Sequence, residues 1–490
     1  MNVLLFTDIA STPGYGKYAG TYKVATEIRA NGYSCQVVDN FSFYSYEQLV
    51  NIVEKFCSGD TLLVGFSCTL SEKRVDGKVY NFGRPDEDFI NLVKHIKSLS
   101  PEIKICLGGG RINVNSYWPG VDFTVINKGD VAVIKLLEHI KYGAEIKTCK
   151  IIPCKVIDGN DYFYTQEEFA SSIIKYEDND IVFPGEALPV EIARGCIFKC
   201  AFCRYDLIGK KIGDWTKHKD CLRQELMRNY EKFGTTHFIF TDELINESVD
   251  KMKMIHDLFT TLPFKITYSS YARLDLIWKF PEMREMLYES GAVSLNFGIE
   301  TMNDEAGKKI GKALGAKRTK ETLDYCKELW DGKVITTSNF IVGLPGESRE
   351  SILNTVDWLV SDECTLDIFG FMPLFLRESD DGRQSNRIEK EPEKFGYNIV
   401  VNESWKNNNM TFAEANKLAY DISMDARVKA KSKIGSAVWV GRILNLGYSL
   451  DDLYETIFEN DFEKKQKLSD EIKQKSLEKK DEYYHKLMNL

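Results

Sequence analysis

Three cysteines with the spacing CxxxCxxC lie in the stretch Gly195-Cys196-Ile197-Phe198-Lys199-Cys200-Ala201-Phe202-Cys203. Thiolates are soft ligands that suit iron–sulfur clusters or zinc. Three cysteines so close together can bind three corners of a [4Fe–4S] cube and leave one iron atom open to a small molecule. The spacing therefore predicts that Cys196, Cys200 and Cys203 are the metal ligands of a catalytic cluster.

A structural zinc site is the alternative interpretation of the same cysteines. Zinc would need a fourth ligand, and His218 and Cys221 are the nearby candidates. Zinc sites usually combine two short pairs of ligands, and no second pair follows here. The remaining cysteines of the chain are scattered, so the iron–sulfur interpretation is favoured.

Strand-like and helical segments alternate on both sides of this stretch. From about Pro189 to residue 385, six apolar segments have the composition of buried parallel strands, at residues 190–192, 237–240, 266–269, 293–297, 334–341 and 366–369. A closed β/α barrel needs eight such units. The sequence therefore predicts a partial (β/α)6 barrel over residues 186–385.

The first 150 residues show the same alternation and predict a separate α/β domain. Its expected strands are residues 3–6, 35–39, 61–67, 103–107 and 123–126, a pattern typical of a doubly wound, Rossmann-like fold. Residues 151–185 are expected to be a linker. Residues 386–490 are expected to be a helical C-terminal domain that closes over the barrel mouth.

Beyond the cysteines, several segments resemble the radical S-adenosylmethionine (SAM) superfamily. Each lies where a strand is expected to end, the edge at which β/α barrels gather their sites. The resemblance implies that Phe202 and Gly343 contact adenine and that Glu300 contacts the SAM ribose. It also implies that the amino group of the methionine part of SAM binds near Thr241, Asp242 and Glu243. Arg273 could pair with the SAM carboxylate.

The chemistry that this resemblance implies depends on two cofactors, a [4Fe–4S] cluster and SAM. In the superfamily the reduced cluster cleaves SAM and yields a 5′-deoxyadenosyl radical, which removes a hydrogen atom from an unreactive C–H bond. The cofactors supply the difficult chemistry and the protein orients the reactants. An external one-electron donor such as flavodoxin or ferredoxin is implied as a partner.

The N-terminal domain resembles the cobalamin-binding (B12-binding) domains of one branch of this superfamily. The resemblance implies cobalamin contacts at strand ends, where glycines allow the close approach of a large ligand: Ser67, Thr69, Gly108, Gly109, Gly110 and Gly129. The histidine loop that ligates cobalt in one version of this domain is absent, since no histidine lies between Met1 and Gly65. The alternative is a domain that has lost its cofactor and only shapes the substrate cleft.

The leading functional interpretation is a cobalamin-dependent methyltransferase that acts on an unactivated carbon of a small molecule or peptide. The alternatives are a radical rearrangement, cyclisation or oxidation, and a metal-binding scaffold or SAM sensor without catalysis. A methylthiotransferase is disfavoured because Cys35, Cys57 and Cys68 do not fall where that class binds its second cluster.

The overall composition sets the remaining expectations. The net charge of -9 argues against general affinity for nucleic acid. No apolar run approaches the ~20 residues needed to span a bilayer, and the N-terminal segment lacks the features of a secretory signal. We therefore expect a cytoplasmic enzyme.

Overall fold

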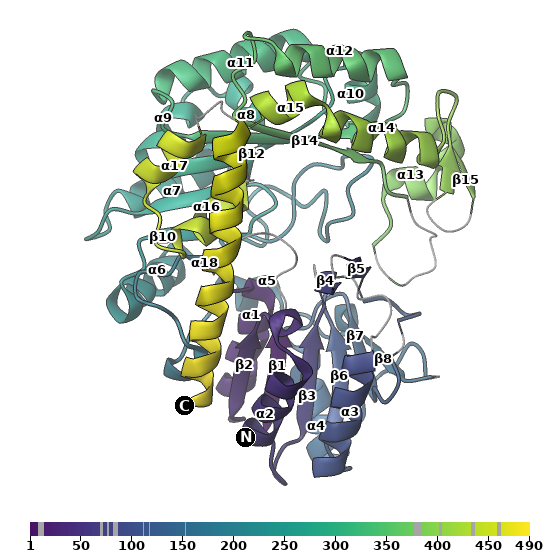
Figure 1. Ribbon diagram of the computed structural model, residues 1–490, viewed down its shortest axis with the longest axis vertical. Coiled ribbons are helices and arrows are strands. Elements are labelled where there is room, and N and C mark those ends of the chain that lie inside the picture. The colour runs from purple at the N-terminus through teal and green to yellow at the C-terminus, as the bar shows by residue number, and fades with distance from the viewer. Residues whose placement is uncertain are drawn as a thin grey trace.

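The computed structural model describes the chain except for residues 8–13, 69–71, 76–77, 82–86, 111, 117, 152, 377–381, 383, 401–403, 433–436 and 458–461. Two six-stranded sheets dominate the described part, one near each end of the long axis of the molecule (Figure 1). None of the described helices is both long enough and apolar enough to cross a membrane.

The N-terminal sheet is parallel throughout and has the strand order β2-β1-β3-β6-β7-β8. Its strands are β1 (Val3–Thr7), β2 (Cys35–Asp39), β3 (Leu63–Ser67), β6 (Lys104–Gly108), β7 (Phe123–Ile126) and β8 (Lys155–Asp158). Its helices are α1 (Ala19–Ala30), α2 (Tyr46–Phe56), α3 (Glu87–Leu99) and α4 (Ala132–Tyr142), and β4 (Glu72–Val75) pairs with β5 (Lys78–Asn81). Helices α1 and α4 contribute to one core and α2 and α3 to another, so both faces of the sheet are covered. The predicted doubly wound fold is confirmed.

Strand β8 corrects the boundary expected for this domain. It lies within the predicted linker, residues 151–185, but it pairs with β7 as the edge strand of the sheet. Ile174 and Tyr176, farther along the predicted linker, are buried in the core formed with α1 and α4. The segment is therefore part of the N-terminal unit, because its few apolar residues complete that core.

The second sheet is also parallel, and its strands follow one another in chain order from β9 to β14. The strands are β9 (Leu188–Val190), β10 (His237–Phe240), β11 (Thr267–Ala272), β12 (Ala292–Glu300), β13 (Ile335–Val342) and β14 (Ile368–Pro373). Between them lie α6 (Lys219–Phe233), α7 (Val249–Phe259), α8 (Leu274–Lys279), α9 (Met283–Glu289), α10 (Asp304–Ile310), α11 (Ala316–Leu329) and α12 (Arg349–Val360). Six units in this order are the predicted partial barrel.

The C-terminal part is helical, as predicted, and it packs on two ends of the barrel. Its elements are α13 (Arg387–Lys390), β15 (Asn398–Val400), β16 (Ser404–Lys406), α14 (Phe412–Met424), α15 (Ala426–Lys431), α16 (Ala437–Leu444), α17 (Leu450–Ile457) and α18 (Phe462–Met488). Trp405 of β16 covers Gly343, which directly follows β13. Helix α16 lies at the opposite end, where Val440 and Ile443 pack on Val293 and Ile335 near the starts of β12 and β13. Only the first of these contacts matches the expected closure over the barrel mouth.

Helix α18 joins the two halves of the molecule. Figure 1 shows it running from the barrel to the N-terminal sheet, so that the two chain termini lie near each other. Ile472 packs with α16 against the barrel, whereas Tyr483 and Leu487 belong to the core formed with α2 and α3. The hydroxyl of Tyr483 accepts a hydrogen bond from the backbone N–H of Asp39 at 3.1 Å. One helix therefore ties the barrel to the N-terminal domain. The short helix α5 (Gln166–Ala170) lies in the segment between the two sheets.

Candidate functional site

The cysteine loop follows β9, the first strand of the barrel. Cys200 is buried and Cys196 and Cys203 are half-buried, and all three thiols are free of disulfides. Burial raises the pKa of the Cys196 thiol and raises that of Cys203 to about 11, and in each case the neighbouring cysteine thiols add to the effect. Thiolates at this buried position would need a cationic partner, which cluster iron would supply. The three residues therefore fit a cluster.

The structure gives no support to the zinc alternative. Among the residues that it describes, no group of three or more His, Cys, Asp or Glu side chains, the three loop cysteines included, is close enough to hold a metal ion, so the zinc alternative is judged by its fourth ligand. The candidate fourth ligand His218 instead lies 3.0 Å from Glu167 through its Nε2 atom, and Cys221 lies on α6.

Backbone contacts hold the cysteine loop in place. Gly195 has φ +82°, and a Cβ there would lie 2.6 Å from the Cβ of Leu207, so a glycine is required directly before Cys196. The backbone N–H of Ala201 donates to the carbonyl of Ile310 at 2.9 Å. The loop is thus held against Leu207, in the segment that follows it, and against the end of α10.

The structure separates the two acids after β10 that sequence reasoning treated as equivalent. Asp242 is buried and accepts hydrogen bonds from the backbone N–H groups of Ile192 at 2.7 Å and Ala193 at 3.0 Å. It also pairs with Lys251 at 2.9 Å. These partners occupy its carboxylate, so Asp242 shapes the loop before the cysteines and is not available to a ligand amino group.

Glu243 is the acid that faces open space. Its Oε2 accepts a hydrogen bond from the backbone N–H of Gly195 at 2.8 Å, and its side chain lines a cavity described below. Burial raises its pKa to about 7, and the neighbouring carboxylates of Asp242 and Glu191 add to the effect. Thr241, the residue before this pair, is tied to the strand: its backbone N–H donates to the carbonyl of Val190 at 3.0 Å.

Arg273 lies beside the cysteines. Its Nη1 lies 3.2 Å from Sγ of Cys200. Asp275 occupies the other edge of the guanidinium, with distances of 2.8 Å to Nε and 2.5 Å to Nη2. Asp275 thus occupies the Nε–Nη2 edge of Arg273, and the expected bidentate pairing of Arg273 with a SAM carboxylate stays a prediction.

Glu300 ends β12 in an unusual conformation. Its backbone φ angle is +69°, a value that residues other than glycine rarely adopt. The pairing of β12 with β13 also shifts register between Phe297 and Glu300. Burial raises the pKa of its carboxyl, and nearby Lys312, 3.8 Å away, opposes that shift. This strained position is consistent with a binding role. Sequence reasoning missed Lys312, which nothing local distinguished from other lysines.

The two expected adenine contacts differ in their surroundings. Phe202 is half-buried next to Cys203, and its carbonyl accepts a hydrogen bond from Asn386 at 3.1 Å. Gly343 has φ +98°, and a Cβ there would lie 2.3 Å from the ring of Trp405. Packing under Trp405 therefore accounts for the glycine at 343.

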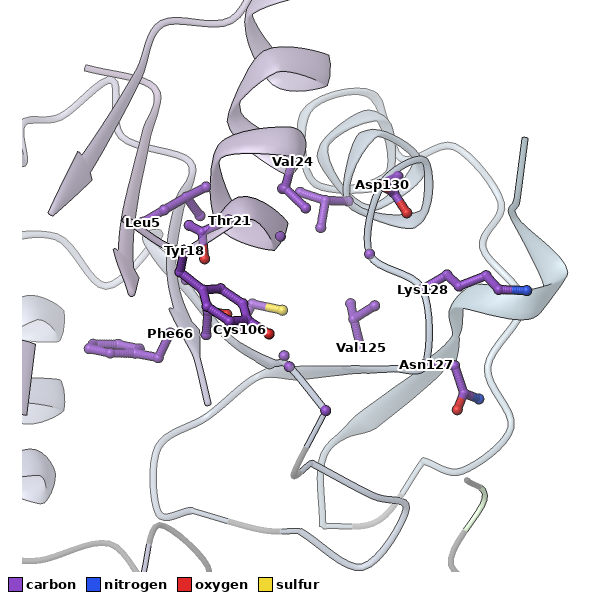
Figure 2. Close-up of a pocket in the computed structure, with 18 of the residues that line it drawn as sticks. Leu5, Tyr18, Thr21, Val24, Phe66, Cys106, Val125, Asn127, Lys128 and Asp130 are labelled. Atoms are coloured by element: carbon purple, nitrogen blue, oxygen red, sulfur yellow. The ribbon is translucent and has the colours of Figure 1, made fainter. Parts of the chain in front are cut away.

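A cavity of about 390 Å³ opens at the carboxyl ends of the N-terminal strands (Figure 2). Five of the six expected cobalamin contacts line it: Ser67, Gly108, Gly109, Gly110 and Gly129. The sixth, Thr69, lies outside the described residues. The cavity also reaches between the sheet and helices α1 and α4, where its walls are apolar; Leu5, Val24, Cys106 and Val125 are among the residues that Figure 2 draws there.

The far wall of this cavity belongs to the barrel. This wall is formed by five residues: Glu191, Arg194, Tyr205, Asp206 and Glu243. These residues immediately flank the cysteine loop or follow β10. A ligand in the cavity would therefore lie between the N-terminal sheet and the cysteines.

Sequence reasoning missed one polar group of this cavity. Thr21, on α1, is 4% exposed and lines the cavity, and its Oγ1 has no hydrogen-bond partner within the part of the chain that the structure describes. A buried hydroxyl without a partner is uncommon and points to a ligand or water. The burial of an isolated helical threonine cannot be recognised from sequence alone.

The cysteines that a methylthiotransferase would need for a second cluster lie apart. Cys35 is in the core formed with α1 and α4, whereas Cys68 is in the core formed with α2 and α3, beside which Cys57 packs. Burial raises the pKa of the Cys35 and Cys57 thiols to about 12. The three thiols therefore do not form one site.

Residues 190–359 match the family model described as the radical SAM superfamily. Among solved structures, the radical S-adenosylmethionine methyltransferase TsrM from Kitasatospora setae, with tryptophan substrate and a SAM analogue bound, matches with a TM-score of 0.65 at 15% identity over 93% of this chain and 97% of that chain. The cobalamin-dependent SAM radical enzyme OxsB, with aqua-cobalamin and SAM bound, matches with a TM-score of 0.53 at 14% identity over 81% of this chain and 55% of that chain. At these identities the likeness is one of fold.

A curated relative matches over less than half of this chain. The ribosomal protein uS12 methylthiotransferase RimO of Jannaschia sp. (strain CCS1) is 26% identical over 213 residues, which are 41% of this chain and 44% of that protein. The chain thus spans less than half the length of this relative.

Proposed function

Because the chain carries a radical SAM domain and shares its fold with cobalamin-dependent enzymes of that superfamily, we propose that it is a cobalamin-dependent radical SAM methyltransferase. Its substrate would be an unactivated carbon of a small molecule or peptide. The observation that carries this proposal is a cavity shared by the N-terminal strand ends and the residues that flank the cysteine loop.

The radical SAM domain implies a [4Fe–4S] cluster and SAM, which together supply a 5′-deoxyadenosyl radical when bound. Cys196, Cys200 and Cys203 would hold the cluster. Glu300, at the end of β12, offers carboxylate oxygens to ribose hydroxyls, with Lys312 beside it. The protein's own contribution is to orient these groups and to exclude water, and an external one-electron donor would supply reducing equivalents.

The cavity has the composition that a cobalamin would require. Its walls between the sheet and the helices are apolar, which suits the flat base of the nucleotide tail, and its glycines leave room for a large ring system. The unpartnered hydroxyl of Thr21 offers a hydrogen bond to such a ligand.

The test is anaerobic reconstitution with iron, sulfide and cobalamin, followed by incubation with SAM and a reductant. We expect about four irons per chain, retained cobalamin in the absorbance spectrum, and release of both 5′-deoxyadenosine and S-adenosylhomocysteine. 5′-Deoxyadenosine without S-adenosylhomocysteine would favour rearrangement, cyclisation or oxidation instead. A protein that binds one zinc and releases neither product would overturn the proposal.

A further inference from the structure

Arg273 follows the last residue of β11 and places a positive charge against one of the three cysteines. Its side chain is only 7% exposed, and its Nη1 lies 3.2 Å from Sγ of Cys200. We propose that Arg273 sets the reduction potential of the cluster by donating a hydrogen bond to the sulfur of Cys200. This inference rests on the cluster of the proposed function but not on cobalamin or on methyl transfer.

The backbone of Arg273 is fixed by a buried amide. Asn246 is fully buried, its Oδ1 accepts from the backbone N–H of Arg273 at 2.9 Å, and its Nδ2 donates to the carbonyl of Arg273 at 3.0 Å. Paired hydrogen bonds of this kind leave the residue little freedom. The backbone position from which the Arg273 side chain extends is therefore fixed by the barrel itself, without a ligand.

The guanidinium is held on its edge and on its face. Asp275 binds the Nε and Nη2 edge, which leaves Nη1 as the group directed at the sulfur. The ring of Phe198 lies 3.6 Å from the guanidinium carbon, so the cation is also stacked on an aromatic side chain of the cysteine loop. Nη2 additionally donates to the carbonyl of Gly311 at 3.3 Å.

Gly311 completes the contact between this arginine and the cysteine loop. It ends α10 with φ +86°, and a Cβ at this position would lie 3.6 Å from Cα of Cys200. The same carbonyl that accepts from Arg273 lies 3.9 Å from Sγ of Cys200. The sulfur, the guanidinium and the end of α10 therefore form one rigid group.

A donor in this position acts more strongly on one redox state than on the other. Reduction adds negative charge to the cluster and its sulfurs, and a charge-assisted hydrogen bond stabilises the more negative state more. Burial strengthens this interaction because the local dielectric constant is low. Arg273 should therefore raise the reduction potential, and its loss should make the cluster harder to reduce.

The experiment is a potentiometric titration, followed by electron paramagnetic resonance, of the reconstituted full-length protein without SAM. We expect Arg273→Gln to lower the ratio of reduced to oxidised cluster at a fixed potential by about tenfold, which is about 59 mV for a one-electron couple. Arg273→Lys, which keeps the charge but not the planar fork, should give a smaller shift.

Arg284→Gln is the matched control, since Arg284 also stacks on an aromatic ring, that of Tyr325, at 3.8 Å but on α9, outside the cysteine site. It should leave the potential unchanged. Iron-loaded Arg273→Gln with the wild-type potential would overturn the inference, as would a shift seen only after SAM is added. If wild-type protein forms no [4Fe–4S] cluster, the proposed function fails first.

Discussion

Arg194 Nη1 lies 3.0 Å from Asp130 Oδ2, and this ion pair joins the barrel to the N-terminal domain two residues before the first cysteine. The side chains are 16% and 9% exposed. Arg194 also pairs with Glu191 at 2.6 Å and lies over the ring of Phe169 at 5.0 Å. The cavity wall and the start of the cysteine loop are thus fixed by one network.

Breaking this pair should destabilise the protein strongly. Arg194→Ala leaves two carboxylates without their cation in a mostly buried site, and loss of one partner of a buried pair costs about 3–5 kcal/mol. Arg427→Ala is the control, because Arg427 pairs with Asp425 with its own side chain 57% exposed, and surface pairs contribute about 0–1 kcal/mol. Urea unfolding measures both, and equal effects would contradict the buried network.

Cys200→Ala should abolish cluster binding. Removing one of three thiolates leaves the cube with two protein ligands, so we expect iron content to fall well below the wild-type level and 5′-deoxyadenosine release to stop. Cys221→Ala, on α6, should retain both iron and product. Loss of metal from the Cys221 variant would instead restore the zinc interpretation.

Thr21→Val should weaken cobalamin binding without harming the fold. The valine keeps the shape of the side chain and removes a hydroxyl that has no partner among the described residues, so the apoprotein should be equally or more stable. One hydrogen bond is worth about 0.5–1.5 kcal/mol, which corresponds to about 2–12-fold in affinity.

Thr26→Val is the matched control for this measurement, because Thr26 lies on the same helix and its Oγ1 already donates to the carbonyl of Tyr22 at 2.8 Å. It should lower stability and leave cobalamin affinity unchanged. Absorbance titration with hydroxocobalamin distinguishes the two variants. Equal affinities for Thr21→Val and wild type would place the ligand elsewhere.

Glu186→Gln should change how stability depends on pH. Burial raises the pKa of Glu186 from its ordinary value of 4.5 to about 7, opposed by Lys17. A raised carboxyl pKa contributes stability that is full below pH 4.5 and is lost as the pH rises through 7. Wild-type protein should therefore lose about 3 kcal/mol across this window that the glutamine variant keeps, measured by urea unfolding at several pH values; parallel profiles would argue against a buried acid here.

Gly343→Ala should destabilise more than Gly332→Ala. Both glycines have positive φ, at +98° and +66°. A Cβ at position 343 would lie 2.3 Å from the ring of Trp405, whereas a Cβ at position 332 would meet nothing within 4 Å. The φ strain alone costs about 1–2 kcal/mol, which is the expected loss for Gly332→Ala in thermal unfolding. A similar loss for both would mean that Trp405 moves aside easily.

The strands of both sheets could be predicted because buried parallel strands are short, continuous apolar runs between turns. Strand β8 was not predicted, since only Val156 and Ile157 of its four residues are apolar and its pairing depends on β7. The cysteines could be predicted from local spacing. The roles of Arg273 and Asp242 could not, because they depend on contacts with residues distant in sequence, and that of Thr21 could not, because it depends on burial.

Helix α18 has a consequence for biosynthesis. The N-terminal sheet reaches its full core only when Tyr483 and Leu487 pack against it, although the residues of that sheet leave the ribosome long before. A nascent chain would therefore expose the face around Phe41 and Tyr44 until translation has passed α18. A ligand that needs both halves of the molecule could therefore bind only after this helix has been synthesised.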